Sequence, residues 1–95
     1  MNTTTNPFPA VPLPPDATFV PDQRFDNDGE RLFWGTDREG VFTAGIQKAD
    51  GCVRARWIKI DHHVDELSAA EARQYAARLI AAADELDRLA GTESP

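Results

Sequence analysis

The stretch that decides the fold is residues 41–61, VFTAGIQKADGCVRARWIKID. An Asp-Gly turn at 50–51 separates two segments rich in β-branched and aromatic residues, which is the pattern of a β-hairpin. Because a loop centred on this turn fixes the register, four cross-strand pairs are expected: Lys48 with Val53, Ile46 with Ala55, Ala44 with Trp57, and Phe42 with Lys59. The sequence therefore predicts two antiparallel strands, 41–48 and 52–61.

This pairing gives the hairpin two different faces, because successive side chains on a strand alternate. One face is apolar along its whole length and carries Phe42, Ala44, Ile46, Val53, Ala55 and Trp57. The second face is polar near the turn and apolar at the base, and carries Gln47, Arg54, Arg56, Val41, Ile58 and Ile60. A single sheet beside one helix does not need apolar residues on both faces. We therefore expect an N-terminal arm or a second copy of the chain to cover the second face.

Two further turn signals precede the hairpin, Asp-Asn-Asp-Gly at 26–29 and Asp-Arg-Glu-Gly at 37–40. They bound two more candidate strands, 17–25 and 30–36. In the first of these, Pro21 lacks the N–H that a ladder needs, so the segment is restricted to the edge of the sheet. The sequence predicts an antiparallel β-meander of three to four strands.

The C-terminal helix begins at a capping box. Ser68 and Glu71 have the spacing at which the serine hydroxyl accepts from the Glu71 N–H while the glutamate reaches back to the serine. Gly91 is expected to end the helix. Apolar residues recur every three or four positions as one buried stripe, consisting of Ala72, Ala76, Leu79, Ala83, Leu86 and Ala90. The predicted fold class is α+β, with the meander packed against one long helix, 68–90.

The N-terminal segment is rich in proline, with six of the seven prolines among the first 21 residues. Proline lacks an N–H and holds the preceding residue extended, so this segment cannot form a helix or a central strand. We expect an extended Pro-rich arm over 1–16, one α+β domain over 17–91 and a disordered tail over 92–95. The sequence leaves open whether the arm is a ligand for another protein or an ordered part of the fold.

Composition excludes several classes of protein. Sixteen acidic against ten basic residues give a net charge of −6, which argues against nonspecific binding to nucleic acid or anionic membranes. A single cysteine, Cys52, excludes an internal disulfide and a cysteine-rich zinc site. No apolar run approaches the roughly 20 residues of a membrane span, and the first residues lack the features of a signal peptide. The expectation is a cytoplasmic protein of a bacterial host without membrane contact.

The densest cluster of ionisable side chains is 61–66, Asp-His-His-Val-Asp-Glu. Adjacent histidines on an extended segment point to opposite faces, so both do not readily bind one ion. A metal site of Asp61, His63 and Asp65 is an alternative to the favoured interpretation, a solvated polar loop. Cys52 lies a whole strand away from the histidines, and Ser68 serves the helix cap. We therefore expect no catalytic residues, no resident metal or cofactor, and no enzyme activity.

Basic residues gather in the last hairpin. Four of them against one acid give residues 41–60 a charge of +3. Arg54, Arg56 and Lys59 are therefore candidates for a nucleic-acid-binding regulator. The expected register places Trp57 on the face opposite Arg54 and Arg56, so the ring and the guanidinium groups do not form one platform for a single strand. Nucleic-acid binding is accordingly an alternative to protein binding.

The helix carries more apolar surface than one sheet covers. Its apolar arc spans roughly 180° on a helical wheel, against roughly 100° for packing on a sheet. This surplus and the apolar base of the second hairpin face indicate a protein partner or a homodimer. The candidate partner-binding residues are Val41, Ile58, Ile60, Tyr75, Ile80 and Leu89.

The helix sequence carries a resemblance. Residues 67–73, Leu-Ser-Ala-Ala-Glu-Ala-Arg, continued by 76–86, resemble a recurrent ending of small uncharacterised proteins of actinobacteria and their phages. In those proteins a short β-hairpin segment, here 45–51, precedes an Ala-rich L-[ST]-x-x-[EQ]-A-R helix. The resemblance implies an actinobacterial or phage source and a small noncatalytic protein. We expect a noncatalytic, homodimeric protein-interaction module that, in a phage, binds a host factor or forms a minor virion component.

Overall fold

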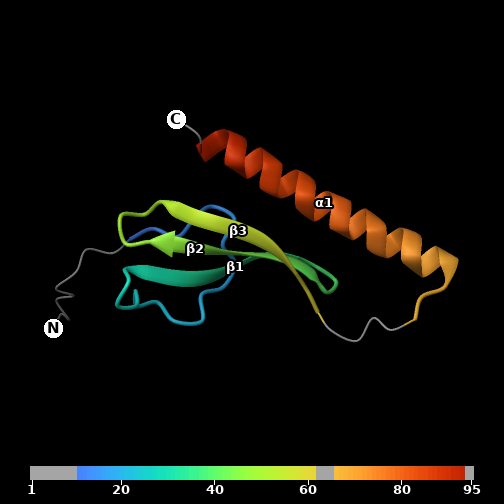
Figure 1. The fold of residues 1–95 in the computed structure, drawn as a ribbon, viewed down its shortest axis with the longest axis horizontal. Coiled ribbons are helices and arrows are strands. Elements are labelled where there is room, and N and C mark those ends of the chain that lie inside the picture. The colour runs from blue at the N-terminus through green and yellow to red at the C-terminus, as the bar shows by residue number, and fades with distance from the viewer. Residues whose placement is uncertain (1–10, 62–65, 94–95) are drawn as a thin grey trace, which may run out of the picture.

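The computed structural model describes residues 11–61 and 66–93. Over this part of the chain it contains one antiparallel sheet of strand order β1-β2-β3 and one long helix (Figure 1). This arrangement confirms the α+β fold class. The elements are β1 (Glu30–Arg38), β2 (Val41–Lys48), β3 (Val53–Ile60) and α1 (Ala69–Glu93).

The two turns of the meander form where Asp and Gly residues were expected to place them. Gly40 and Gly51 adopt φ values of 96° and 97°, which are accessible to glycine because it lacks a Cβ. An aspartate side chain supports each turn: Asp37 accepts a hydrogen bond from the Gly40 N–H (3.1 Å), and Asp50 accepts one from the Cys52 N–H (2.9 Å). The Cys52 N–H is the main reason that the pKa of Asp50 lies below its ordinary value.

The register of the last hairpin matches the expected pairs except beside the turn. Ile46, Ala44 and Phe42 pair as predicted, but Val53 pairs with Gln47 instead of Lys48. The register shifts between Ile46 and Gln47, so Arg54 is the extra residue of a β-bulge. Val53 therefore belongs to the face of Gln47, not to the face of Trp57.

The predicted first strand, 17–25, is reduced to one isolated bridge between Phe19 and Trp34. The Trp34 N–H donates to the Phe19 carbonyl (2.7 Å), and the Thr18 N–H donates to the Trp34 carbonyl (2.8 Å). The segment leaves the edge of β1 before Pro21, whose missing N–H would interrupt any longer ladder. The meander therefore has three strands over the described residues.

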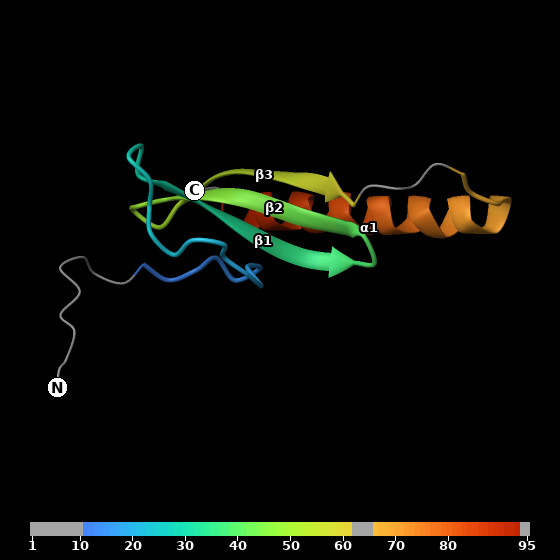
Figure 2. The same cartoon turned by 90° about the horizontal axis from the view of Figure 1, so that it is seen from below.

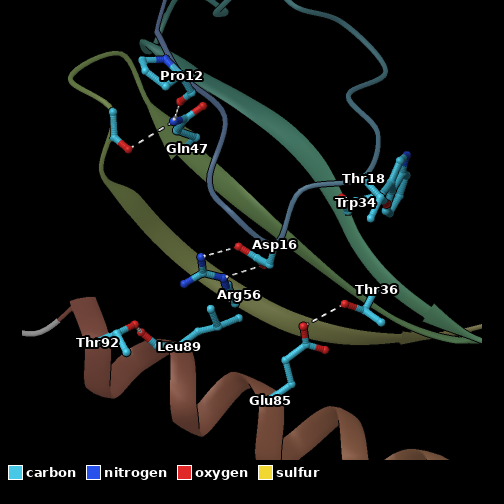
Figure 3. A network of polar contacts seen from close by, with 11 residues as sticks. Pro12, Asp16, Thr18, Trp34, Thr36, Gln47, Arg56, Glu85, Leu89 and Thr92 are labelled. Atoms are coloured by element: carbon cyan, nitrogen blue, oxygen red, sulfur yellow. Dashed lines mark hydrogen bonds and ion pairs between the residues drawn. The ribbon is translucent and has the colours of Figure 1, made fainter.

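The sheet has one covered face and one open face, defined here by their residues. The covered face carries Arg31, Phe33, Val41, Thr43, Gly45, Gln47, Arg56, Ile58 and Ile60. The open face carries Leu32, Trp34, Phe42, Ala44, Ile46, Ala55, Trp57 and Lys59. The helix lies behind the sheet in Figure 2, and Figure 3 shows it and residues 12–16 against the same strands. The expectation about the two faces is thus reversed: the helix and the arm both cover the face of Gln47 and Arg56, and the face of Trp57, which is apolar except for Lys59, is left open.

The core lies between the covered face and the packing elements. Phe33 and Val41 of the sheet and Ala82 of the helix are completely buried. Gly45 allows the Phe33 ring to lie flat on the sheet, since a Cβ at position 45 would come within 2.5 Å of the Phe33 Cζ atom. The Phe33 ring thus packs directly against the backbone of β2 on the covered face.

The helix begins as predicted but ends later. Ser68 Oγ accepts from the Glu71 N–H (3.1 Å) and Glu71 Oε1 accepts from the Ser68 N–H (2.9 Å), which confirms the capping box. The predicted end at Gly91 is wrong, because α1 continues to Glu93. Nothing lies within 4 Å of a Cβ placed on Gly91, and its φ is not positive, so this glycine continues the helix instead of capping it.

The buried stripe of the helix is rotated relative to the predicted one. Ala72, Ala76, Ala83 and Ala90 are exposed, although the sequence pattern placed them against the sheet. The side chains that are buried or half-buried are instead Tyr75, Arg78, Leu79, Ala81, Ala82, Glu85, Leu86 and Leu89. The rotated stripe buries Glu85, which bonds to β1, and half-buries the larger apolar side chains Leu79, Leu86 and Leu89.

Candidate functional site

A row of aromatic side chains crosses the open face. Phe19 pairs with Trp34, Trp34 with Ala44, and Ala44 with Trp57, so these four residues lie side by side across the sheet. Directly paired residues share a face, so the edge residue Phe19 extends this surface beyond β1. Phe19 is 58% exposed and Trp57 is 36% exposed, whereas Ala44 between the rings is completely buried. The row therefore consists of three aromatic side chains and one alanine, Ala44, which lies between Trp34 and Trp57.

Neighbouring side chains fix the orientation of the Trp34 ring. The Phe42 ring lies edge-on to it, with centroids 5.4 Å apart and an interplanar angle of 70°. The Lys59 Nζ atom lies 5.2 Å from the centroid of the same ring, in a cation–π contact. The open face is thus an ordered aromatic surface with a positive charge at one side.

A second exposed surface is the projecting, N-terminal half of α1, where polar side chains such as Glu71, Arg73 and Gln74 accompany alanines and Ile80. In both views the N-terminal half of the helix extends past the end of the sheet (Figure 1, Figure 2). Residues 69–74 are all exposed, and Tyr75 is the first half-buried side chain. Farther along, Ile80 is 62% exposed although it lies level with the sheet contacts. The capping box stabilises this part of the helix locally, without support from the sheet.

The structure separates the six predicted partner-binding residues into three groups. Val41 is completely buried beneath the covering elements, so it cannot contact a partner in this structure. Ile58, Tyr75 and Leu89 are half-buried. Ile60 and Ile80 are exposed, at 50% and 62%. The open-face aromatic residues were not among the predicted set, although the alternation of Leu32 and Trp34 in 30–36 is the pattern of a strand with one apolar face.

The three predicted nucleic-acid-binding residues lie in different surroundings. Arg56 is buried and forms an ion pair with Asp16 (2.7 Å), with side-chain exposures of 7% and 3%. Arg54, at the bulge, forms an ion pair with Glu30. Lys59 is exposed and lies over the Trp34 ring. The geometry does not bring the three cations together into one exposed patch.

The candidate metal site falls largely outside the described residues. His63 and Asp65 belong to the segment 62–65, so the predicted set of Asp61, His63 and Asp65 stays a prediction. Among residues 11–61 and 66–93, no group of three or more His, Cys, Asp or Glu side chains is arranged to hold a metal ion. Cys52 is a free, exposed thiol.

A buried glutamate joins the helix to β1 (Figure 3). Glu85 Oε2 accepts from the Thr36 hydroxyl (2.7 Å) and Glu85 Oε1 accepts from Arg38 Nη1 (2.8 Å). These partners precede Glu85 by 49 and 47 residues, so no local sequence pattern indicates the contact. Because the carboxylate is paired and bonded, its burial does not leave an unpaired charge.

Comparison of the chain with protein-family models, curated proteins and solved structures finds no match. The resemblance to small actinobacterial and phage proteins therefore stays a prediction. Within the described part of the chain, no helix has both the length and the apolar character that crossing a membrane requires.

Proposed function

We propose that this protein is a noncatalytic interaction module that associates with a second copy of itself through the open face. The observation that carries the proposal is the aromatic row of Phe19, Trp34 and Trp57, in which Phe19 and Trp57 are exposed and Trp34 is half-buried. An antiparallel sheet with one covered face normally presents polar side chains on the other. Here the other face is apolar, and contiguous apolar surface of this kind is typical of interaction sites.

The size of the open face sets how the two copies must meet. Strands of eight or nine residues, spaced about 4.8 Å apart and rising about 3.3 Å per residue, present a face of about 400 Å². Two such faces bury about 800 Å² together, which is below the roughly 1,000 Å² of a specific interface. We infer that the projecting half of α1, with Tyr75 and Ile80, adds the remaining contact. A phage or actinobacterial protein of this kind would use the same surface on a host factor or in a virion.

Light scattering at micromolar concentration tests self-association. We expect a dimer whose Kd rises at least about tenfold in Trp57→Lys, because aromatic side chains at the centre of an interface carry much of its energy. Ile80→Glu is expected to weaken the dimer less, since it lies at the margin.

The matched control for the association test is Leu13→Lys, which changes another exposed apolar residue that lies outside both surfaces. A wild-type chain that stays monomeric at the highest concentration would contradict self-association. A dimer unchanged by both Trp57→Lys and Ile80→Glu would show that the surface is a different one.

Nucleic-acid binding has less support from the contacts. Of its three candidate cations, Arg56 is held by Asp16 and Arg54 by Glu30. Stacking on Trp34 and Trp57 beside Lys59 would remain available to a single strand. The structure therefore favours a protein partner for the same aromatic surface.

A further inference from the structure

Buried polar side chains of the covered face point toward the N-terminal arm. Arg31 is 8% exposed, Gln47 is 1% exposed, and the Arg56 side chain is 7% exposed. All three direct donors at residues 11–16, which lie over the sheet as an extended stretch, 11–14, followed by a turn at Pro15 and Asp16 that the Ala17 N–H closes on the Pro14 carbonyl (3.0 Å) (Figure 3). Burying polar groups is costly unless each is bonded, so this face is built around the segment it holds.

Two of these side chains recognise the main chain of the arm. Arg31 Nη2 donates to the Val11 carbonyl (2.8 Å) and Gln47 Nε2 donates to the Pro12 carbonyl (2.7 Å). Arg31 and Gln47 are direct cross-strand partners, and Arg31 Nε donates to Gln47 Oε1 (2.9 Å), which fixes the orientation of the amide. Extended proline-rich segments leave their carbonyls free to accept such bonds, because they have no internal hydrogen bonds.

The third side chain recognises a carboxylate. Arg56 Nε and Nη2 donate to Asp16 Oδ2 (3.1 Å) and Oδ1 (2.7 Å), a two-bond arrangement that matches the planar guanidinium to one carboxylate. The Arg56 guanidinium also lies 5.8 Å from the centroid of the Phe33 ring. Between the two ends, Pro14 is buried. The pattern that this face recognises is therefore an extended proline-rich stretch followed by an aspartate.

One buried group at the aspartate end has no partner. Thr43 is completely buried, and its Oγ1 atom makes no hydrogen bond in the described structure. It lies against Gly35, whose position is itself close to the Asp16 carbonyl: a Cβ at position 35 would lie 3.4 Å from that oxygen. A buried hydroxyl without a partner is rare in folded proteins. The arm thus fills this site without satisfying all of its hydrogen-bonding groups.

The arm is also separable from the rest of the fold. The pairing of β1, β2 and β3 involves no residue before Glu30, and the edge bridge begins only at Phe19. The helix is joined to β1 by Glu85 and to the turn between β1 and β2 by the Arg78–Glu39 ion pair. Neither contact involves residues 11–16. Release of the arm would therefore leave the sheet and its helix contacts in place.

We propose that the covered face is a peptide-binding site for an extended, proline-rich segment that carries an aspartate, and that residues 11–16 occupy it as a built-in ligand. A partner of this chemistry must displace the arm to bind. Because the arm is tethered, its effective concentration at the site is on the order of millimolar, so it suppresses binding of competing peptides. The site is on the opposite side of the sheet from the aromatic row, so this proposal does not depend on self-association.

The experiment uses the full chain and a fluorescent peptide with the sequence of residues 8–17, followed by fluorescence anisotropy. Asp16→Asn removes the charge that holds the arm, so the peptide is expected to bind this variant at least about tenfold more tightly than the wild-type chain. A peptide with Asn in place of its aspartate is not expected to bind the Asp16→Asn chain more tightly than it binds the wild-type chain. The matched control is Asp22→Asn, an exposed aspartate that bonds only locally to Arg24.

A reversal of charge separates recognition from a general effect on folding. The Arg56→Asp chain is expected to prefer a peptide with arginine in place of its aspartate over the native peptide by at least about tenfold. Trp57→Lys is expected to leave peptide binding unchanged, which distinguishes this site from the open face. Equal binding of the native peptide to the Asp16→Asn chain, the Asp22→Asn chain and the wild-type chain would overturn the proposal.

The wild-type chain provides a measurement that does not depend on either variant. If circular dichroism shows that Asp16→Asn is unfolded, unlabelled peptide is added to the isotopically labelled wild-type chain at millimolar concentration, and the backbone amide resonance of Asp16 is followed by NMR. Displacement of the arm is expected to shift this resonance, because the Asp16 of the labelled chain leaves Arg56 while the unlabelled peptide takes its place. A resonance that stays in place at saturating peptide would show that the arm is a fixed part of the fold.

Discussion

The two faces of the sheet are made from the same three strands, yet they bury different kinds of side chain. On the covered face, Arg31, Gln47 and Arg56 are buried and bonded to the arm, among fully buried apolar residues such as Phe33. On the open face, aromatic rings such as Trp57 keep contact with solvent. In this small protein, these polar side chains are therefore buried through their contacts with a distant segment of the chain, while hydrophobic ones such as Trp57 stay partly exposed.

The largest expected effect is on the core of the covered face. Phe33→Ala removes a completely buried ring and leaves a cavity against Gly45, which is expected to lower the free energy of unfolding by about 3–5 kcal/mol. Trp57→Ala on the open face is the matched comparison and is expected to cost less, about 1–2 kcal/mol in the monomer, because its ring is already 36% exposed. Urea denaturation of both variants measures the contrast. Equal losses would mean that the open face is packed in solution.

The next effect distinguishes two ion pairs that involve neighbouring arginines of β3. Arg56→Met leaves Asp16 without its buried partner and is expected to cost about 3 kcal/mol, at the lower end for such pairs because the arm can move and hydrate the carboxylate. Arg54→Met breaks a pair whose arginine is 51% exposed, and it is expected to cost less than about 1 kcal/mol. Thermal denaturation ranks the two variants. The proposal that Asp16 anchors the arm would fail if Arg54→Met were the more damaging change.

The smallest effect concerns the first turns of α1, residues 69–74, which are all exposed and precede the Arg78–Glu39 ion pair. Hydrogen bonding to Ser68, chiefly through the Ser68 N–H, lowers the pKa of Glu71 below its ordinary value of 4.5. The folded state therefore binds the proton less readily than the unfolded chain, so the carboxylate stabilises the fold above pH 4.5. This contribution is lost as the pH falls through the lower, folded-state pKa.

Circular dichroism at 222 nm between pH 6 and pH 2 measures the pH effect on the helix. The wild-type chain is expected to lose a small amount of helicity that Glu71→Ala lacks already at pH 6, because alanine cannot accept the hydrogen bond from the Ser68 N–H. Superimposable titration curves for the two chains would show that the cap contributes nothing to the helix in solution.

Local sequence patterns were sufficient for β1, β2, β3 and the start of α1, but not for the predicted strand 17–25 or the predicted helix end at Gly91. The Asp-Gly turns, the register at Ala44 and Trp57, and the capping box at Ser68 each depend on residues close together in the chain. The predictions of which side chains share a face were wrong where contacts between residues distant in the chain determine the orientation of a side chain or helix. The bulge at Arg54 changes the face of Val53, and the buried stripe of the helix contains Glu85, which bonds to Thr36 and Arg38, instead of the predicted alanines.

The candidate surfaces were less predictable than the fold for the same reason. The apolar faces of the hairpin were recognised from alternation, but which face the helix and arm would cover depends on contacts such as that between Asp16 and Arg56. Those residues are 40 positions apart, and neither has a local pattern that indicates the other. The aromatic row was missed because it joins Phe19 to Trp34 and Trp57, which follow it by 15 and 38 residues.

The same separation has a consequence for the order in which the chain folds. Each strand of the meander pairs with its immediate neighbour in sequence, and a hairpin of this kind forms within about 1–10 μs. Asp16 leaves the ribosome 40 residues before Arg56, an interval of about 2–8 s at ordinary rates of synthesis. During those seconds the early segment has nothing to bind, and its prolines keep it extended instead of letting it form a competing helix. The part of the molecule that is synthesised early is thus among the last to reach its place.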